Sequence, residues 1–137
     1  MNPTIKQQLT IRNATSECDA LMTFLSESLS KLNLSEEIYN DIRLASEETF
    51  SNIVNYAYQD NEETIIIEIT ASSQSVDLTF IDNGIAFNPL TDCNRDIDTI
   101  DKCEGGMGIH LIKTLTDEQA YKRTQQRNVF TLTKHYT

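Results

Sequence analysis

Basic residues are scarce in this chain. It has 11 Lys and Arg against 21 Asp and Glu, for a formal net charge of −10 in 137 residues. This deficit argues against a general nucleic-acid-binding protein, because phosphate backbones attract clustered Lys and Arg. The acidic residues are scattered, with a modest cluster at 92–104, so the charge does not identify a partner.

Long apolar runs are also missing, and no segment has the length needed to cross a bilayer. The N-terminal residues MNPTIKQQLT lack a basic region followed by an apolar one, so we expect no secretory signal. These absences predict a cytoplasmic protein without a membrane partner. The length, with 39% apolar and 23% charged residues, predicts one soluble domain over residues 1–137.

Cysteine and histidine are few and dispersed. Cys18, Cys93 and Cys103 are odd in number, and no two lie two residues apart. This pattern argues against a disulfide framework or a zinc knuckle, so we expect reduced thiols. His110 and His135 are isolated, and a solvated role is the better interpretation of His110 than a catalytic one.

Glycine occurs four times, but three of the four are Gly105, Gly106 and Gly108, in the stretch GGMGIHL. Helical spacing follows from Ile109 onward. Glycines permit positive φ and a close approach of the backbone to a ligand, and a helix N-terminus favours phosphate. Taken alone, the stretch fits a phosphate cradle and a flexible loop before a core helix equally well.

Periodicity along the rest of the chain predicts an α+β fold. We expect strands at 4–12, 64–70, 76–81, 119–124 and 128–135, and helices at 17–32, 35 to about 58, and 109–115. Thr15 or Ser16 is expected to cap the first helix and Ser35 the second. The order β-α-α-β-β-α-β-β predicts a two-layer sandwich, with helices on one face of a mixed, mostly antiparallel sheet.

Three polar residues lie beside the apolar stripe of the second helix. Glu48, Asn52 and Asn55 are spaced i, i+4 and i+7, which predicts that they share one face. They are either solvated surface residues or a carboxylate and amides presented into a cleft. In a cleft, the carboxylate could polarise a hydroxyl group and an amide oxygen could ligate Mg²⁺.

A carboxylate also ends the strand at 76–81. Asp82 is followed by Asn83 and Gly84, which is common turn chemistry. The same carboxylate could accept a hydrogen bond from the exocyclic amine of adenine. Residues 90–104 are polar and without clear period, so we interpret them as a mobile loop or lid.

Taken together, these separated stretches resemble the GHKL ATP-binding fold, also called the Bergerat fold. ASEETFSNIVNYAY resembles its N-box, DNGIAFNPL its first glycine box, EGGMGIHLIKTLTDE its second, and VFTLTK its last strand. The match covers nearly the whole chain in the right order. Within the superfamily, the chain is most similar to the small, single-domain anti-sigma-factor serine/threonine kinases of bacteria.

The resemblance implies ATP and Mg²⁺ as cofactors and gives roles to the candidate residues. Glu48 would be the general base toward the acceptor hydroxyl, Asn52 would hold Mg²⁺ against the phosphates, and Asn55 would line the same pocket. Asp82 would bind adenine, and Gly84 would give the base room. Residues 90–104 would form the ATP lid, and the phosphates would be cradled by backbone N–H groups of Gly105, Gly106 and Gly108.

The implied function is a kinase that phosphorylates a serine on an anti-anti-sigma-type protein and sequesters a sigma factor or similar regulator. Kinases of this type often form homodimers. The chain departs from the family pattern at Ala86, where a second glycine is usual, and near Glu104, where some kinases carry Arg. The second departure leaves an alternative open, a nucleotide-gated binding module without significant phosphotransfer.

Overall fold

A computed structural model describes residues 4–57, 63–90 and 105–136. The described strands form one five-stranded sheet in the order β1-β2-β3-β5-β4. Every neighbouring pair is antiparallel. The described sheet is therefore fully antiparallel rather than mixed, within the α+β class that the sequence predicts. The strands are β1 (Ile5–Arg12), β2 (Thr64–Ala71), β3 (Ser75–Asp82), β4 (Glu118–Thr124) and β5 (Arg127–His135).

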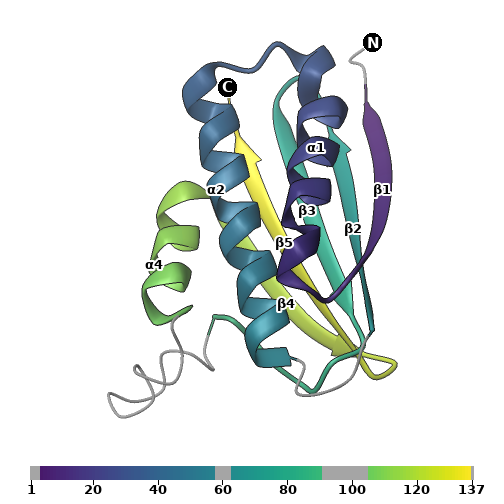
Figure 1. Cartoon of the computed structure of the whole chain (residues 1–137). Coiled ribbons are helices and arrows are strands. Elements are labelled where there is room, and N and C mark those ends of the chain that lie inside the picture. The colour runs from purple at the N-terminus through teal and green to yellow at the C-terminus, as the bar shows by residue number, and fades with distance from the viewer. Residues whose placement is uncertain (1–3, 58–62, 91–104, 137) are drawn as a thin grey trace.

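The helices pack on one face of this sheet, as Figure 1 shows. They are α1 (Cys18–Leu29), α2 (Glu36–Asn52) and α4 (Gly105–Leu115), and α4 packs beside α2. A π-helical turn, Ile53–Ala57, continues α2. The two-layer architecture predicted from the order of elements is therefore confirmed.

The two predicted helix caps have different outcomes. Ser35 caps α2, because its Oγ accepts a hydrogen bond from the Ile38 N–H at 3.2 Å. The cap expected from Thr15 or Ser16 is wrong. Those residues lie in a short 3₁₀ turn, Thr15–Glu17, that leads directly into α1 without a side-chain cap.

Alternation along the strands builds the core between the layers. On β2, β3 and β5, every second side chain faces the helices and is buried. The buried apolar side chains of these series are Ile65, Ile67, Ile69, Ala71, Val76, Leu78, Phe80, Phe130 and Leu132. Apolar residues of the helices cover them, with Leu21, Leu25 and Leu29 from α1 and Ile42 and Phe50 from α2.

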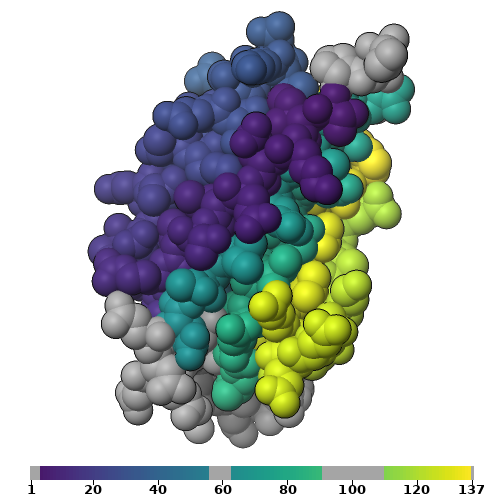
Figure 2. Space-filling model, turned by 90° about the vertical axis from the view of Figure 1, so that its right-hand side faces the viewer, coloured from purple at the N-terminus to yellow at the C-terminus, as the bar shows by residue number. Residues whose placement is uncertain are grey.

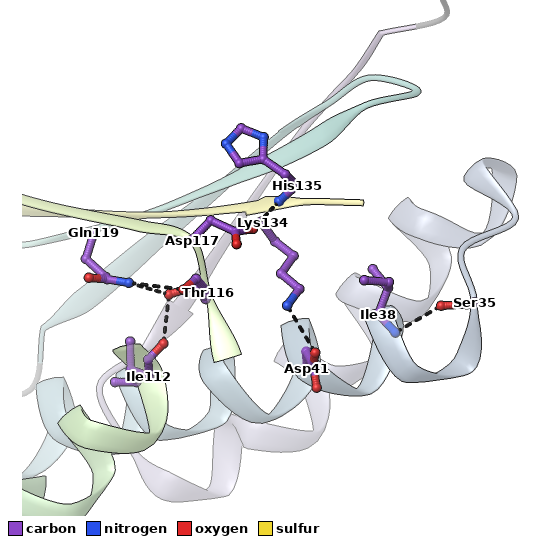
Figure 3. A network of polar contacts seen from close by, with 9 residues as sticks. All are labelled: Ser35, Ile38, Asp41, Ile112, Thr116, Asp117, Gln119, Lys134 and His135. Carbon is purple, nitrogen blue, oxygen red and sulfur yellow. Dashed lines mark hydrogen bonds and ion pairs between the residues drawn. The ribbon is translucent and has the colours of Figure 1, made fainter. Parts of the chain in front are cut away.

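Polar contacts tie the helices to the sheet near the C-terminal end of β5 (Figure 3). Lys134 on β5 forms an ion pair with Asp41 on α2, at 3.0 Å from Nζ to Oδ2. The Asp117 carboxylate accepts a hydrogen bond from the backbone N–H of His135 at 2.6 Å. Since Lys134 pairs with Val76 at the start of β3, these contacts lie at the end of the sheet away from Asp82.

The opposite face of the sheet carries no described helix, and Figure 2 shows strands β4 and β5 forming that side of the molecule. Its side chains are largely polar. Thr79 and Thr131 share a hydrogen bond of 3.1 Å, and the Thr133 hydroxyl donates to Asp77 at 2.6 Å. Among the residues described, no helix combines the length and apolar character that crossing a membrane requires.

Candidate functional site

The predicted site residues gather at one end of the two layers. In Figure 1, the C-terminal ends of α2 and β3 and the N-terminal end of α4 all lie at the lower end of the molecule. Glu48 and Asn52 belong to α2, Asp82 ends β3, and Gly105 begins α4. The fold therefore brings together segments that are far apart in the sequence.

Asp82 is the last member of the inward-facing series on β3, which explains why a carboxylate lies in the core layer. Asp82 as a whole is 2% exposed. The backbone N–H of Gly84 donates to Oδ1 at 2.8 Å, and Asn128 Nδ2 donates to the same oxygen at 2.9 Å. Among the described residues, both hydrogen bonds to this carboxylate end on Oδ1, so Oδ2 is the atom left for a ligand.

The surroundings of Asp82 also shift its protonation. Burial raises the pKa of the Asp82 carboxyl above its ordinary value of 3.8. The hydrogen bonds from Asn128 and Gly84 and the charge of Arg123 lower the pKa and oppose this effect in part. A buried carboxylate that is only partly compensated is typical of a binding or catalytic site.

The structure adds Asn128, which the sequence analysis missed. Asn128 begins the buried series of β5, lies opposite Asp82, and is 3% exposed. It donates to the Ile85 carbonyl at 2.7 Å and accepts from the Phe87 N–H at 3.2 Å. The available signal was an amide that continues the inward series of apolar residues on a predicted strand, because such a polar group needs a buried partner.

Asn52 lies on the buried side of α2, one turn after Glu48. Asn52 is 2% exposed, whereas Glu48 is half-buried. Within the described parts of the chain, the Asn52 Nδ2 atom has no hydrogen-bond partner. A buried donor without a partner costs about 1–3 kcal/mol, so a ligand that engages this amide would recover part of that cost.

Asn55 does not share the position predicted for it. It lies in the π-helical turn and is exposed, and its Nδ2 donates to the Ser51 hydroxyl at 3.3 Å. The i, i+4, i+7 argument assumed an uninterrupted α-helix, whereas a π turn has a wider repeat. The structure therefore keeps the predicted proximity of Glu48 and Asn52 and separates Asn55 from the buried amide.

The glycine stretch is helical from its first residue. Gly105, Gly106 and Gly108 lie in the first turns of α4, so this helix begins earlier than the predicted residue 109. No glycine in the described segments has positive φ. Their use is therefore the absence of a side chain beside the first N–H groups of a helix, which are unpaired within it.

Most of the predicted ATP lid lies outside the part of the chain that the structure describes. Of residues 90–104, residues 91–104 are not among the described residues.

The described chain has no group of three His, Cys, Asp or Glu side chains that could hold a metal ion. Mg²⁺ is usually held by one or two protein ligands together with substrate phosphates, so a single amide such as Asn52 fits that mode.

Comparison with known proteins bears on the family and the fold of the chain. The model of the histidine kinase-like ATPase domain family matches residues 11–134. A crystal structure of the RsbU and RsbW domains of Rv1364c from Mycobacterium tuberculosis superposes with a TM-score of 0.68. That match has 18% identity and covers 96% of this chain and 32% of the other. At this identity, the structural match supports the fold.

Sequence relatives include the serine-protein kinase RsbW of Bacillus mycoides, 27% identical over 97 residues, or 65% of this chain and 59% of the relative. The serine-protein kinase RsbW of Listeria monocytogenes is 29% identical over 102 residues, or 69% and 64%. The chain thus spans less than two thirds of the length of these relatives. The family match over residues 11–134 is nonetheless extensive, and the chain belongs to the histidine kinase-like ATPase domain family, of the GHKL type.

Proposed function

We propose that this chain is an ATP-binding regulatory serine/threonine protein kinase of the anti-sigma type. The observation that carries the proposal is the pairing of two buried polar groups at one end of the fold. The Asp82 carboxylate has one oxygen that accepts no hydrogen bond from the described residues, and the buried Asn52 amide nitrogen has no described partner. A nucleotide carries an amine that could donate to Asp82 and phosphate oxygens that could accept a hydrogen bond from the Asn52 amide nitrogen, so its two ends match these two groups.

Asp82 would form the adenine end of the site. Its Oδ2 would accept a hydrogen bond from the exocyclic amine, while Oδ1 stays bound to Gly84 and Asn128. Gly84 is buried and has no side chain, which leaves room for the base. Asp82 must be ionised for this contact. Gly84 and Asn128 already donate to Oδ1, so a proton on the carboxyl group would lie on Oδ2, the atom that is to accept from the amine.

α2 and α4 would form the phosphate end. Asn52 would hold Mg²⁺ through its amide oxygen, and the bound cation would neutralise phosphate charge. The first N–H groups of α4, at Gly105, Gly106 and Gly108, would donate to phosphate oxygens. Glu48 would orient the acceptor serine hydroxyl and receive its proton as the oxygen attacks the γ-phosphoryl group, whose bond to the β-phosphate oxygen breaks to release ADP.

The relatives named as serine-protein kinases support a serine as the phosphate acceptor. We propose that the chain is one cytoplasmic domain, with a lid at 90–104, acting on the serine of an anti-anti-sigma-type protein. We further propose that it sequesters a sigma factor or similar regulator and that it forms a homodimer. Electrostatic stabilisation and positioning would supply most of the catalysis, as is usual in phosphoryl transfer.

The second candidate is a nucleotide-gated binding module without significant phosphotransfer. It is favoured by the sequence near Glu104, where Lys102 is the nearest preceding cation and some kinases carry Arg. Incubation with labelled ATP, Mg²⁺ and candidate partner proteins separates the two. Transfer of label to a partner serine supports the kinase, and nucleotide-dependent complex formation without transfer supports the module.

The role of Glu48 gives the kinase proposal a direct test. Replacing Glu48 with Gln keeps the shape of the side chain but removes the proton acceptor. We expect ATP affinity to change by less than about threefold, and the phosphotransfer rate to fall by about 10²–10⁴, the usual contribution of a general base. An unchanged rate in single-turnover assays with the same partner would remove Glu48 from the catalytic role.

A further inference from the structure

β4 contributes to the candidate adenine end, although none of its residues was expected there. In the antiparallel register, Asp82 lies opposite Asn128, and Asn128 lies opposite Arg123. The three residues therefore form one row across β3, β5 and β4, at the end of the side that faces the helices. This row is polar, whereas the adjacent inward-facing row is aromatic and consists of Phe80, Phe130 and Tyr121.

Asn128 uses both polar atoms of its side chain to hold the turn after β3. Its Nδ2 donates to Asp82 Oδ1 at 2.9 Å and to the Ile85 carbonyl at 2.7 Å. Its Oδ1 accepts from the Phe87 N–H at 3.2 Å and from the Tyr121 hydroxyl. These partners fit only one orientation of the amide, since donors face Oδ1 and acceptors face Nδ2. Asn128 thus fixes both ends of the 82–87 turn.

Arg123 completes the arrangement from outside. A single guanidinium nitrogen, Nη1, donates to the Gly84 carbonyl at 2.8 Å and to Asn128 Oδ1 at 3.1 Å. Hydrogen bonds from a charged donor are stronger than those from a neutral one. The Arg123 residue as a whole is exposed, so its replacement leaves the apolar core intact. It can therefore be tested without unfolding the protein.

We propose that Arg123 and Asn128 are positioning residues that hold the 82–87 turn so that Asp82 selects adenine over other purines. This inference rests on the proposed ATP-binding function and adds to it the source of base selection. Oδ1 of Asp82 is already bound to Asn128 and Gly84, which fixes the rotation of the carboxylate and hence the direction of Oδ2. Arg123 braces Asn128 and Gly84 together, so it controls that direction without touching the base.

The test compares ATP with inosine triphosphate, whose base carries an oxygen in place of the exocyclic amine. Calorimetry would measure both affinities for the unmodified chain, Arg123→Met and Arg123→Lys. The matched control is Arg127→Met, which removes the same charge from the same hairpin at an exposed position. We expect Arg123→Met to weaken ATP binding by about tenfold, as for the loss of the one hydrogen bond between the Asp82 carboxylate and the exocyclic amine. Inosine triphosphate binding should change much less.

The ratio of the two affinities is the deciding quantity. A merely structural role of Arg123 would weaken both nucleotides equally and leave the ratio unchanged, which would overturn the proposal. Arg123→Lys should restore part of the ratio because an ammonium group can still donate, and Arg127→Met should keep it. Asn128→Asp, which keeps the shape but turns a donor into an acceptor facing Asp82, should also lower the ratio.

A second measurement separates this proposal from the proposed function. Amide hydrogen exchange of Gly84 and Phe87, whose N–H groups are bonded to Asp82 and Asn128, reports the held turn without nucleotide. We expect faster exchange at both amides in Arg123→Met than in Arg127→Met. Unchanged exchange would overturn the positioning role even if ATP binds. An unmodified chain that binds neither nucleotide would instead overturn the proposed function, and adenine selection with it.

Discussion

The buried carboxyl group of Asp82 should make the free energy of unfolding depend on pH. Its pKa is raised above 3.8 in the folded chain, chiefly by burial. Between 3.8 and the folded pKa, the folded state binds more protons than the unfolded state, so stability falls as pH rises through this window. We expect Asp82→Asn to remove this loss. The free energy of unfolding of Asp82→Asn, measured in urea, should rise relative to that of the unmodified chain as pH increases from 3.8 through the folded pKa of Asp82.

The control is Asp19→Asn, which removes one acidic group from an exposed position on α1. It corrects for the change in net charge. An equal pH dependence of stability in Asp82→Asn and Asp19→Asn would show that the burial of Asp82 does not set the shift.

Asn52 shows how a residue proposed to bind a ligand can weaken the ligand-free fold. Its buried amide nitrogen has no hydrogen-bond partner in the described chain. We expect Asn52→Leu, a change of similar volume, to raise the free energy of unfolding by about 1–2 kcal/mol by removing an unpaired polar group. The same change should abolish measurable binding of Mg²⁺-ATP in calorimetry. Stability and binding should therefore move in opposite directions.

Asn55→Leu is the matched control, because Asn55 is an exposed amide three residues further along the same segment. Its effect on stability should stay within about 0.5 kcal/mol, as for most surface substitutions. If Asn52→Leu is less stable than the unmodified chain and still binds Mg²⁺-ATP, the unpaired amide neither destabilises the fold nor contributes to nucleotide binding.

At the scale of elements, the start of α2 depends on one side chain. Ser35 Oγ accepts the Ile38 N–H, and Glu36 and Glu37 occupy the first turn, where negative charge is favourable. We expect Ser35→Ala to lower the free energy of unfolding by about 1 kcal/mol, whereas Ser35→Asp keeps most of it. Urea unfolding of both variants checks this. Equal losses in the two would mean that the hydroxyl does not act as a cap.

The elements themselves were largely predictable because their signals are local. Alternation marked the strands, and the serine cap together with the apolar stripe marked α2. The π turn at Ile53–Ala57 was not predictable, because it changes the helical spacing although the segment contains no glycine or proline. The early start of α4 was missed for a related reason, since three glycines favour a loop by propensity alone.

The contacts around Asp82 could not be predicted, because they depend on pairing between distant strands. β5 lies between β3 and β4, although it follows β4 in the chain. Only this order sets Asn128 opposite Asp82 and Arg123 opposite Asn128. The sequence supplied the carboxylate and its turn, whereas the residues that hold them became visible only with the register of the sheet.

In the molecule as a whole, polar contacts and the candidate site lie at opposite ends of the sandwich. The ion pair of Lys134 with Asp41 joins the two layers at one end, where Asp117 also bonds the connection between α4 and β4 to β5. The candidate site lies at the other, where α2, β3 and α4 converge (Figure 1). A net charge of −10 would repel a triphosphate at long range, so the proposed site would need local donors and Mg²⁺ to offset that repulsion.

The central claim is that a nucleotide binds at the convergence of α2, β3 and α4. Amide chemical shifts recorded by NMR during a titration with Mg²⁺-ATP test it most directly. A groove of about 650 Å³ between β1 and α1, lined by Lys6, Phe24 and Lys31 among others, serves as the internal control. We predict saturable shifts at residues 48–52, 82–87 and 105–110 and none along this groove. Shifts confined to the groove, or no shifts at all, would contradict the account.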